Sequence, residues 1–311
     1  MKSLNKIILK YFDIKGSIFS GQSFRWRISE TDCQKFIGVV AGELLILEKK
    51  GQDATTLYCS SPTITGISLS CFATRYFSLD IDNRQAFPES FARTYPTLWA
   101  LLQPYLHLKL LRQEPFETLI TFMCAQGIGM RIIRRQVDYL SRTFGRRCTT
   151  AIDGEPFTYH AFPTPDALAA ADPDTLRLCT NNNCARARNI IDAAVAVASG
   201  KLDLEALKDP EIPLDEARNR LCAQHGIGLK IADCILLFGL CRHSAFPIDT
   251  HVHQYLAEWF SFDEALKTLN RKNYLLLQRR ATELFNPDLA GLAGHILFHA
   301  WRKEIKRLES F

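Results

Sequence analysis

Apolar and polar residues alternate along the first part of the chain. Residues 36–40 and 43–48 alternate on either side of Ala41-Gly42, which predicts a β-hairpin. Shorter alternating stretches lie at 18–19, 23–28 and 55–59. Alternation with a period of two is typical of strands that bury one face. We therefore predict that residues 1–80 form an antiparallel sheet with helices on a single face.

From about residue 70 the apolar residues recur at the spacing of α-helices. Helices are predicted over 87–95, 98–102, 115–124, 131–144, 167–171, 185–199, 213–223, 262–285 and 288–308. Residues 146–165 show neither period, so we expect a loop there. The fold class is therefore α+β, with an N-terminal antiparallel β-sheet domain (1–80) followed by a mostly α-helical body (81–311).

Two of these helices meet at a glycine-rich turn. Gly226, Ile227 and Gly228 separate the helix at 213–223 from a second apolar helix, so we expect a helix-hairpin-helix over 214–240. The first N–H groups of the second helix have no partner within the helix and attract anions. The turn suits a phosphate of the DNA backbone, although short GxG turns are also common in other proteins.

Two chemically active side chains follow this turn. Lys230 lies in the first turn of the second hairpin helix, where a partly buried amine can act as a nucleophile. Asp249 lies nineteen residues further on, after Pro247-Ile248 and before the apolar run 251–260. Taken alone, Lys230 is a surface lysine and Asp249 is a helix N-cap. Their order after the hairpin favours a catalytic pair.

Composition and charge limit the compartment and the partners. The chain has 311 residues, is 47% hydrophobic and carries a net charge of +5, which permits a polyanionic partner. Its ten cysteines form no CxxC pair and lie mostly in apolar runs, so we expect reduced thiols in a reducing compartment. No apolar run reaches the ~18 residues of a membrane span, and the N-terminal apolar stretch is too short for a signal peptide.

Three separate segments resemble one enzyme family. The segment 226–252, with the hairpin, Lys230 and Asp249 in order, is similar to the helix-hairpin-helix DNA glycosylase superfamily and to its 8-oxoguanine branch. The stretch 20–26 (SGQSFRW) resembles the N-terminal signature of that branch, and 112–117 (RQEPFE) enters a helix that carries a cysteine, as in the family. The three matches stand in the family's order within residues 20–300.

The resemblance implies a bifunctional DNA glycosylase and AP lyase. Lys230 would attack C1′ of the damaged nucleotide, displace the base and form an imine, and β-elimination would then nick the strand. Asp249 would stabilise the cationic sugar as the glycosidic bond breaks. Some glycosylases of this superfamily carry an iron–sulfur cluster on C-terminal cysteines, but no cysteine follows Cys241 here, so we expect no metal and no cofactor. The expected partner is double-stranded DNA containing 8-oxoguanine, bound by a monomer in the nucleus or the bacterial cytoplasm without a membrane.

The resemblance also assigns residues to recognition. The flipped base would lie between Phe298 and Cys234, which follows Lys230 by one helical turn. The carbonyl of Gly21 would accept the N7–H that distinguishes 8-oxoguanine from guanine. Contacts with the DNA backbone and the opposite base are expected from Gly226, Ile227, Gly228, His251 and Arg186. Taken alone, Phe298 is a core residue and His251 is a surface histidine.

The recognition residues depart from the family more than the catalytic pair does. Gly294 stands where the family has a glutamine that reads the base, and Ala185 where it has a wedge tyrosine. The asparagine and one of the two arginines that hold the opposite cytosine correspond to Gly127 and Ile132, and a family carboxylate is replaced around Ala300-Trp301. We therefore expect a relaxed preference for the base opposite the lesion.

Two other functions are compatible with the sequence. One is a glycosylase of the same superfamily that removes an alkylated or mismatched base. The other, of a different class, is a noncatalytic helix-hairpin-helix DNA-binding protein. A binding module needs neither Lys230 nor Asp249, so borohydride trapping on damaged duplex would separate catalysis from binding.

Overall fold

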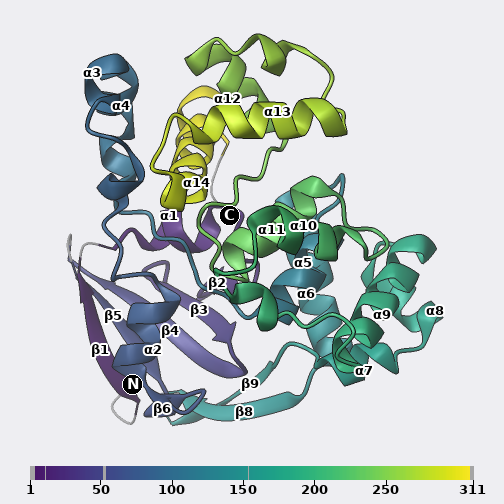
Figure 1. The fold of residues 1–311 in the computed structure, drawn as a ribbon. Helices are drawn as coiled ribbons and strands as arrows, with labels where there is room; N and C mark the ends of the chain where they lie inside the picture. The colour runs from purple at the N-terminus through teal and green to yellow at the C-terminus, as the bar shows by residue number, and fades with distance from the viewer. Residues whose placement is uncertain (1–3, 11, 52–53, 153, 309–311) are drawn as a thin grey trace.

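A computed structural model describes residues 4–10, 12–51, 54–152 and 154–308. The chain forms a β-sheet domain and two helical lobes (Figure 1). Five antiparallel strands make the sheet in the order β1-β5-β4-β3-β2, as the alternation predicts. Their bounds are β1 Asn5–Lys10, β2 Trp26–Ile28, β3 Lys35–Val40, β4 Glu43–Lys50 and β5 Ala54–Cys59, and two short strands follow, β6 Thr63–Ile64 and β7 Ile67–Ser68.

Two helices cover one face of the sheet. Helix α1 (Ile14–Phe19) and helix α2 (Leu69–Tyr76) share a hydrophobic cluster with strand residues such as Leu45 and Leu57. The prediction of a strand at 18–19 is therefore wrong. Five of the six residues of α1 are buried, so the helix has no polar face that would have revealed its period. Its start is set by Asp13, whose carboxylate accepts the Gly16 N–H at 3.0 Å.

The middle lobe contains the predicted hairpin. Its helices are α5 Pro115–Cys124, α6 Met130–Phe144, α7 Pro165–Ala169, α8 Pro173–Cys179, α9 Cys184–Ala198, α10 Leu214–Cys222 and α11 Leu229–Phe238, with a 3₁₀ turn at Ala206–Lys208. Residues 146–165, expected to form a loop, instead contain a hairpin of β8 (Arg147–Ile152) and β9 (Glu155–His160). Most residues of the two strands are exposed or half-buried, so no apolar alternation marks them.

The terminal lobe joins an early segment to the end of the chain. Its helices are α3 Phe91–Thr94, α4 Pro96–Leu102, α12 Thr250–Phe260, α13 Arg271–Thr282 and α14 Ala290–Ala300, continued by a π-helical turn, Trp301–Ile305. Its 3₁₀ turns lie at Asn83–Ala86, Gln103–Tyr105, Asp263–Leu266 and Pro287–Leu289. The helix predicted over 262–285 is thus two pieces, because Asn270 caps a new helix by accepting the Asn273 N–H at 2.9 Å.

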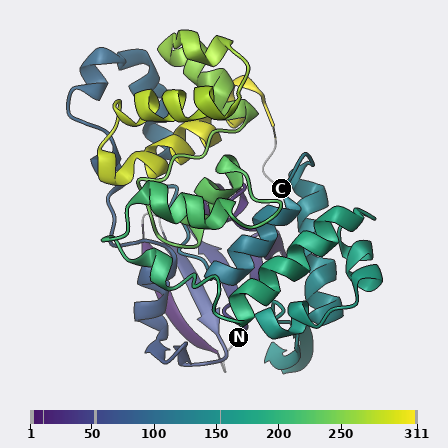
Figure 2. The ribbon, with the colours of Figure 1, turned by 45° about the vertical axis from the view of Figure 1, so that its right-hand side comes forward.

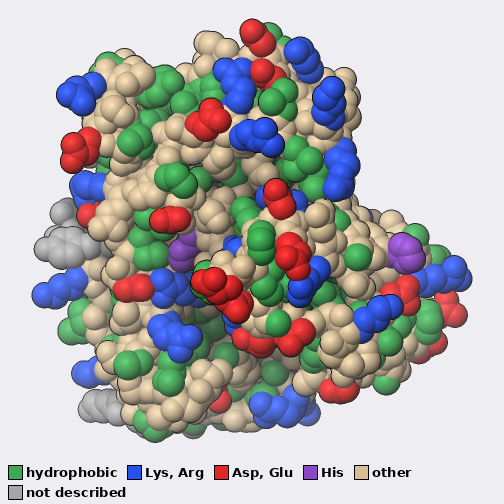
Figure 3. Space-filling view, in the orientation of Figure 1, with side chains coloured by type: hydrophobic (Ala, Val, Ile, Leu, Met, Phe, Trp, Pro, Cys, Tyr) green, Lys and Arg blue, Asp and Glu red, His purple; other side chains and the backbone are tan. Residues whose placement is uncertain are grey.

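The described residues form two large hydrophobic cores and a small third cluster of Phe24, Ile133 and Val137. One core lies within the β-sheet domain, and the other runs through both helical lobes, from Ala86 to Trp301. Two views show the terminal lobe above the sheet and the middle lobe beside it (Figures 1 and 2). Acidic and basic side chains are interspersed on the face seen in Figure 3, with Lys and Arg gathered over α12 and α13. Among the described residues, no helix is long and apolar enough to cross a membrane.

Candidate active site

Helices α10 and α11 form a hairpin within the predicted range. Gly226 has a φ of +84°, which L side chains rarely adopt, and a Cβ there would lie 2.6 Å from Asn189 Nδ2. Gly228 has an extended conformation and is the N-cap of α11, without a side-chain hydrogen bond. The first N–H groups of α11 are therefore open to an anion such as a DNA phosphate.

A buried network of hydrogen bonds holds the hairpin in place. The carboxylate of Asp233 in α11 is fully buried and accepts bonds from Arg218 Nε at 2.7 Å, Tyr274 Oη at 2.6 Å and Gln278 Nε2 at 2.8 Å. These donors belong to α10 and α13, so one side chain ties three helices together. A buried charge is tolerable because it is paired and fully hydrogen-bonded. Residues on α11 consequently project from a rigid support.

A cavity of about 1120 Å³ lies where the three parts of the molecule meet. The β-sheet domain, the α5–α6 loop, α11, the start of α12 and α14 all contribute to its wall. Six residues that the sequence singles out line it: Gly21, Lys230, Cys234, Asp249, His251 and Phe298. Arg186 and the turn 226–228 lie outside its wall. Residues from both ends of the chain therefore share one site.

Lys230 occupies the second position of α11. Its side chain is half-buried, and Nζ lies 5.5 Å from the centroid of the Phe122 ring. It forms no ion pair within the part of the chain that the structure describes. Cys234, one turn further along, is buried, and this burial raises the pKa of its thiol to about 11 against the opposing effect of the Lys230 charge. The thiol is therefore neutral at physiological pH and does not act as a thiolate.

Asp249 is the N-cap of α12, as predicted from its position. Its Oδ1 accepts the N–H groups of His251 and Val252, each at 2.9 Å. The other oxygen, Oδ2, accepts no hydrogen bond from any residue that the structure describes. Capping therefore fixes the carboxylate and leaves one oxygen for the cavity, so the structural and the catalytic interpretations are compatible.

Gly21 and Phe298 lie against each other in the lining of the cavity. Gly21 has a φ of +90°, and a Cβ at this position would lie 2.8 Å from Met130 Sδ and 3.9 Å from Phe298 Cε1. The ring of Phe298 also packs edge-on against His251, with centroids 5.9 Å apart. Burial lowers the pKa of His251, although the charge of Asp249 opposes this effect. The imidazole is therefore neutral at physiological pH. A planar ligand can therefore stack on the ring of Phe298 and lie close to the backbone of Gly21.

Arg302 is a cavity residue that the sequence analysis missed. It is 5% exposed, its guanidinium carbon lies 5.4 Å from the centroid of Phe298, and Nη1 lies 3.8 Å from Met130 Sδ. No described carboxylate pairs with it. The available signal was its spacing of four residues after Phe298, which puts both on one side of a helix. An arginine that lacks a strong acceptor in a recognition cavity suggests a ligand that supplies one.

The arginine expected to contact the opposite base lies outside the cavity and is hydrogen-bonded to another part of the protein. Arg186 Nη2 donates to the carbonyl oxygen of Gln126 at 2.8 Å, and Gln126 Nε2 donates to the carbonyl oxygen of Gly226. Arg186 is thus tied to the α5–α6 loop. Gly127 in the same loop has a φ of +68°, and its side-chain position is open. Ala185 is exposed at the start of α9.

Metal-binding geometry is not found in the described part of the chain. No group of three or more His, Cys, Asp or Glu residues is placed to hold a metal ion there. The ten cysteines are free thiols. Besides the amine of Lys230, the carboxylate of Asp249 and the guanidinium of Arg302, the cavity is lined by the thiol of Cys234 and the imidazole of His251.

Comparisons with known proteins agree with this geometry. A family model described as 8-oxoguanine DNA glycosylase, N-terminal domain, matches residues 5–119. The chain is 29% identical over 284 residues to N-glycosylase/DNA lyase OGG1 of Arabidopsis thaliana, which covers 90% of this chain and 75% of that protein. It is 28% identical over 247 residues to the N-glycosylase/DNA lyase of Saccharomyces cerevisiae, covering 75% and 64%.

Solved structures show the same architecture. The 8-oxoguanine glycosylase/lyase of Clostridium acetobutylicum, in complex with double-stranded DNA containing cytosine opposite 8-oxoguanine, superposes with a TM-score of 0.75 at 25% identity, over 96% of this chain and 97% of that one. MBOgg1 in complex with a low-affinity DNA ligand gives a TM-score of 0.77 at 26% identity, over 96% and 98%.

The sheet domain, the hairpin and the cavity with its lysine and aspartate define a helix-hairpin-helix DNA glycosylase. Within that class, the chain is similar to 8-oxoguanine DNA glycosylases with DNA lyase activity, through the N-terminal family model and through relatives that match most of its length. The fold class and the resemblance expected from the sequence are thereby confirmed.

Proposed function

We propose that this protein excises 8-oxoguanine from double-stranded DNA and cleaves the strand at the resulting abasic site. The observation that carries the proposal is the placement of Lys230 and Asp249 in one cavity beside Phe298. The nitrogen of Lys230 forms a bond to C1′ while the bond from C1′ to the base breaks, and the base leaves with the electron pair and takes up a proton. The lysine nitrogen then loses a proton, the C1′–O4′ bond of the sugar breaks and O4′ takes up a proton, which leaves an imine between Lys230 and C1′. The imine loses a C2′ proton, and the bond from C3′ to its phosphate oxygen breaks, so that the phosphate leaves with the electron pair.

Asp249 stabilises the sugar as positive charge develops on it. Its carboxylate is fixed by two backbone N–H groups, so it does not have to reorganise during the reaction. The free oxygen Oδ2 supplies the negative charge. Asp249 is therefore assigned to the transition state rather than to DNA binding.

The flipped base lies between Cys234 and Phe298, with Gly21 at its N7 edge. Arg302 takes over the role of the glutamine that the family places at Gly294. A side chain at Gly294 is excluded, because its Cβ would lie 2.5 Å from Phe246 Cε2. Arg302 approaches the same cavity from the next turns of the chain and offers its N–H groups to an oxygen of the base. The acceptor-rich 8-oxoguanine fits this arrangement.

DNA binding is assigned to the hairpin and to two flanking side chains. The N–H groups of Gly226 and Gly228 bind a backbone phosphate beside Ile227, whose own N–H donates to the carbonyl oxygen of Gln224 at 3.2 Å. His251 lies near another phosphate, and Arg186 lies on the side of the opposite base. Residues 1–80 and 81–311 are the two domains. The site of action is the compartment that holds chromosomal DNA, the nucleus or the bacterial cytoplasm.

The test is a set of duplexes that differ in one base: 8-oxoguanine, an alkylated purine or normal guanine. Purified protein is incubated with each duplex, with and without sodium borohydride. Strand cleavage and a covalent protein–DNA adduct are expected with 8-oxoguanine alone. Adducts with the alkylated purine instead would indicate another glycosylase of the superfamily, and binding without cleavage of any duplex would indicate a noncatalytic module.

A further inference from the structure

A second cavity, of about 560 Å³, lies between the β-sheet domain and α6. Phe24 and Arg131 line both this cavity and the one that contains Lys230, so the two are neighbours. Six arginines line the second cavity: Arg25, Arg27, Arg131, Arg134, Arg135 and Arg142. Asp138 is the one acidic residue in its described lining. We call this site the arginine pocket.

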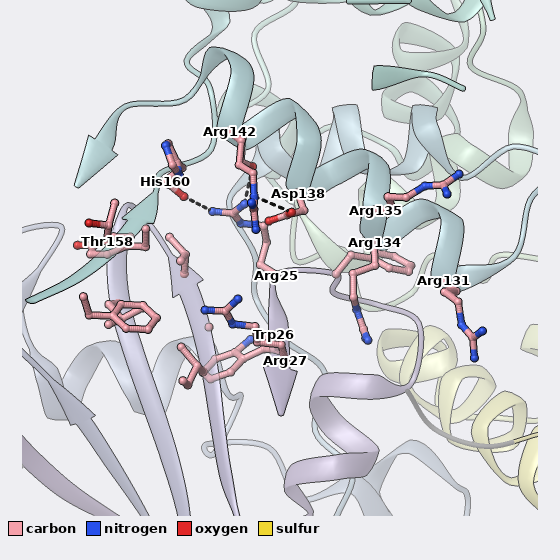
Figure 4. Close-up of a pocket in the computed structure, with 18 residues that line it drawn as sticks. Arg25, Trp26, Arg27, Arg131, Arg134, Arg135, Asp138, Arg142, Thr158 and His160 are labelled. Carbon is pink, nitrogen blue, oxygen red and sulfur yellow. Dashed lines mark hydrogen bonds and ion pairs between the residues drawn. The ribbon is translucent and has the colours of Figure 1, made fainter. Parts of the chain in front are cut away.

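The arginines reach the pocket from two elements. Positions 131, 134, 135, 138 and 142 recur at helical spacing along α6, and Arg25 and Arg27 come from the start of β2. Figure 4 shows Arg25 and Arg142 side by side at Asp138, with Arg27 on the sheet below them and Thr158 and His160 of β9 opposite. The pocket therefore depends on the β8–β9 hairpin that the sequence did not predict.

The positive charge of the arginine pocket is not neutralised by its neighbours. Asp138 is used by Arg142, whose Nε lies 2.8 Å from its carboxylate. Arg25 donates to the carbonyl oxygen of His160 at 2.5 Å, and its nearest acidic group is Glu117 at 4.0 Å. Burial raises the pKa of Glu117 to about 7, so it is about half protonated at neutral pH.

Arg27, Arg131 and Arg135 form no ion pair with any described residue, which leaves several like charges around one cavity. All three side chains are exposed, so an anion from solvent can reach them. Phe157 and Tyr159 of β9 add aromatic surface to the lining, and the Arg27 guanidinium carbon lies 5.7 Å from the Phe157 ring centroid. The cavity volume falls in the range of about 300–1,000 Å³ that is usual for small-molecule sites.

We propose that the arginine pocket binds the phosphate and base of a nucleotide. Guanidinium groups form paired hydrogen bonds with phosphate oxygens, and aromatic faces accept bases of any sequence. The nucleotide is either free in solution or part of the DNA strand next to the lesion, since Arg131 belongs to both cavities. The site is distinct from the Lys230 cavity, and its occupancy does not require catalysis.

Direct binding is measured first. Isothermal titration calorimetry at low salt is carried out with pyrophosphate and with deoxyguanosine monophosphate. The double variant Arg27→Gln/Arg142→Gln is compared with Arg93→Gln, which removes an exposed arginine from α3 in the other lobe. Saturable binding that weakens at least tenfold in the double variant and is unchanged in Arg93→Gln supports a free-nucleotide site. Circular dichroism and thermal unfolding verify that the variants are folded.

The second experiment measures binding to DNA. The affinity for an undamaged duplex is measured against salt concentration, because each neutralised phosphate adds about 0.9 to the slope of log K against log salt. A slope that falls by about one or two in the double variant, and not in Arg93→Gln, identifies a DNA phosphate as the occupant. If neither probe binds in a saturable way and the slope is also unchanged, the proposal is wrong. Neither measurement depends on base excision, so the proposed function is tested separately.

Discussion

The two walls of the lesion cavity are built in different ways. On one wall, Lys230 and Asp249 each occupy the first positions of a helix, and capping and turn geometry fix their backbones. On the other wall, Gly21, Met130 and the pair Phe298 and Arg302 come from three distant segments and meet only through tertiary packing. The wall with the proposed catalytic pair follows the pattern of the similar family, whereas the other wall, which we call the recognition wall, keeps Gly21 and Phe298 but lacks the family's glutamine at Gly294.

This difference shows which parts of an enzyme can vary independently. A helix start is a local structure, so the lysine and the aspartate keep their geometry when the surrounding residues change. A base-reading contact needs two or more distant residues to change together, as with Gly294, which cannot carry a side chain, and Arg302, which enters the cavity. Breaking each wall in turn should therefore produce different kinetic signatures, total loss on one side and altered selectivity on the other.

The largest effect is expected for Lys230→Gln. Removing the amine removes the nucleophile and the imine, so borohydride trapping and strand cleavage should both be abolished. Binding to the damaged duplex should persist, because the hairpin and the recognition wall remain intact. Gel-shift and trapping assays measure the two properties. The matched control is Lys201→Gln, which changes an exposed lysine outside the cavity. An undiminished adduct in Lys230→Gln would move the nucleophile to another residue.

Asp249→Asn should slow base excision by about 10²–10³-fold, the usual loss for one electrostatic group at a transition state. Asparagine is as good an N-cap as aspartate, so the free energy of unfolding should change little. Single-turnover excision and thermal unfolding are the measurements. Unchanged excision together with a lower melting temperature would mean that Asp249 is only a cap.

The elements that could be predicted from the sequence are also the local ones, and those that depend on tertiary packing could not be predicted. The β3–β4 hairpin, the glycine turn and the Asp249 cap are local and could be predicted from turn and capping residues. The β8–β9 hairpin could not, because its strands are mostly exposed and carry no apolar period. Helix α1 was misread as a strand because it is almost completely buried. Length also matters, because α5, α11 and α14 are about as buried as α1 but have ten or eleven residues, and the sequence predicts them as helices.

The site was predictable to the extent that family motifs carry it. Six of the expected residues line one cavity, which residue spacing alone does not establish. The burial of Arg302 could not be predicted from the sequence, because its guanidinium packs against Met130, which is distant in sequence, and against the ring of Phe298 one turn earlier. Arg186 lies apart from the cavity because its side chain is bound by the Gln126 carbonyl, a contact between α9 and the α5–α6 loop.

The recognition wall is broken by Arg302→Met, which keeps volume and removes the charge. A hydrogen bond that involves a charged group contributes about 1.5–3 kcal/mol, which corresponds to a loss of roughly 10–150-fold in excision of 8-oxoguanine. The loss should be smaller for lesions with fewer oxygen acceptors, so selectivity should fall with rate. Single-turnover rates on two different lesions measure this, with Arg279→Met on the exposed side of α13 as the control. Equal losses for both lesions would assign Arg302 to the fold instead of the base.

The smallest effect concerns the base opposite the lesion. The family's asparagine corresponds to Gly127, which has no side chain, the second arginine corresponds to Ile132, and Arg186 is bonded to Gln126. Because each good base contact contributes about 1–3 kcal/mol of discrimination, their loss should leave 8-oxoguanine excised opposite adenine, guanine or thymine almost as fast as opposite cytosine. Single-turnover excision on four duplexes that differ only at this base is the measurement. A preference for cytosine of a hundredfold or more would contradict the prediction and would assign the contact to other side chains, such as Gln126 or Arg131.

Gly127→Asn sharpens the test, because asparagine tolerates the φ of +68° and its Cβ meets no described atom within 4 Å. This variant should gain a preference for cytosine that Gly127→Ala does not gain.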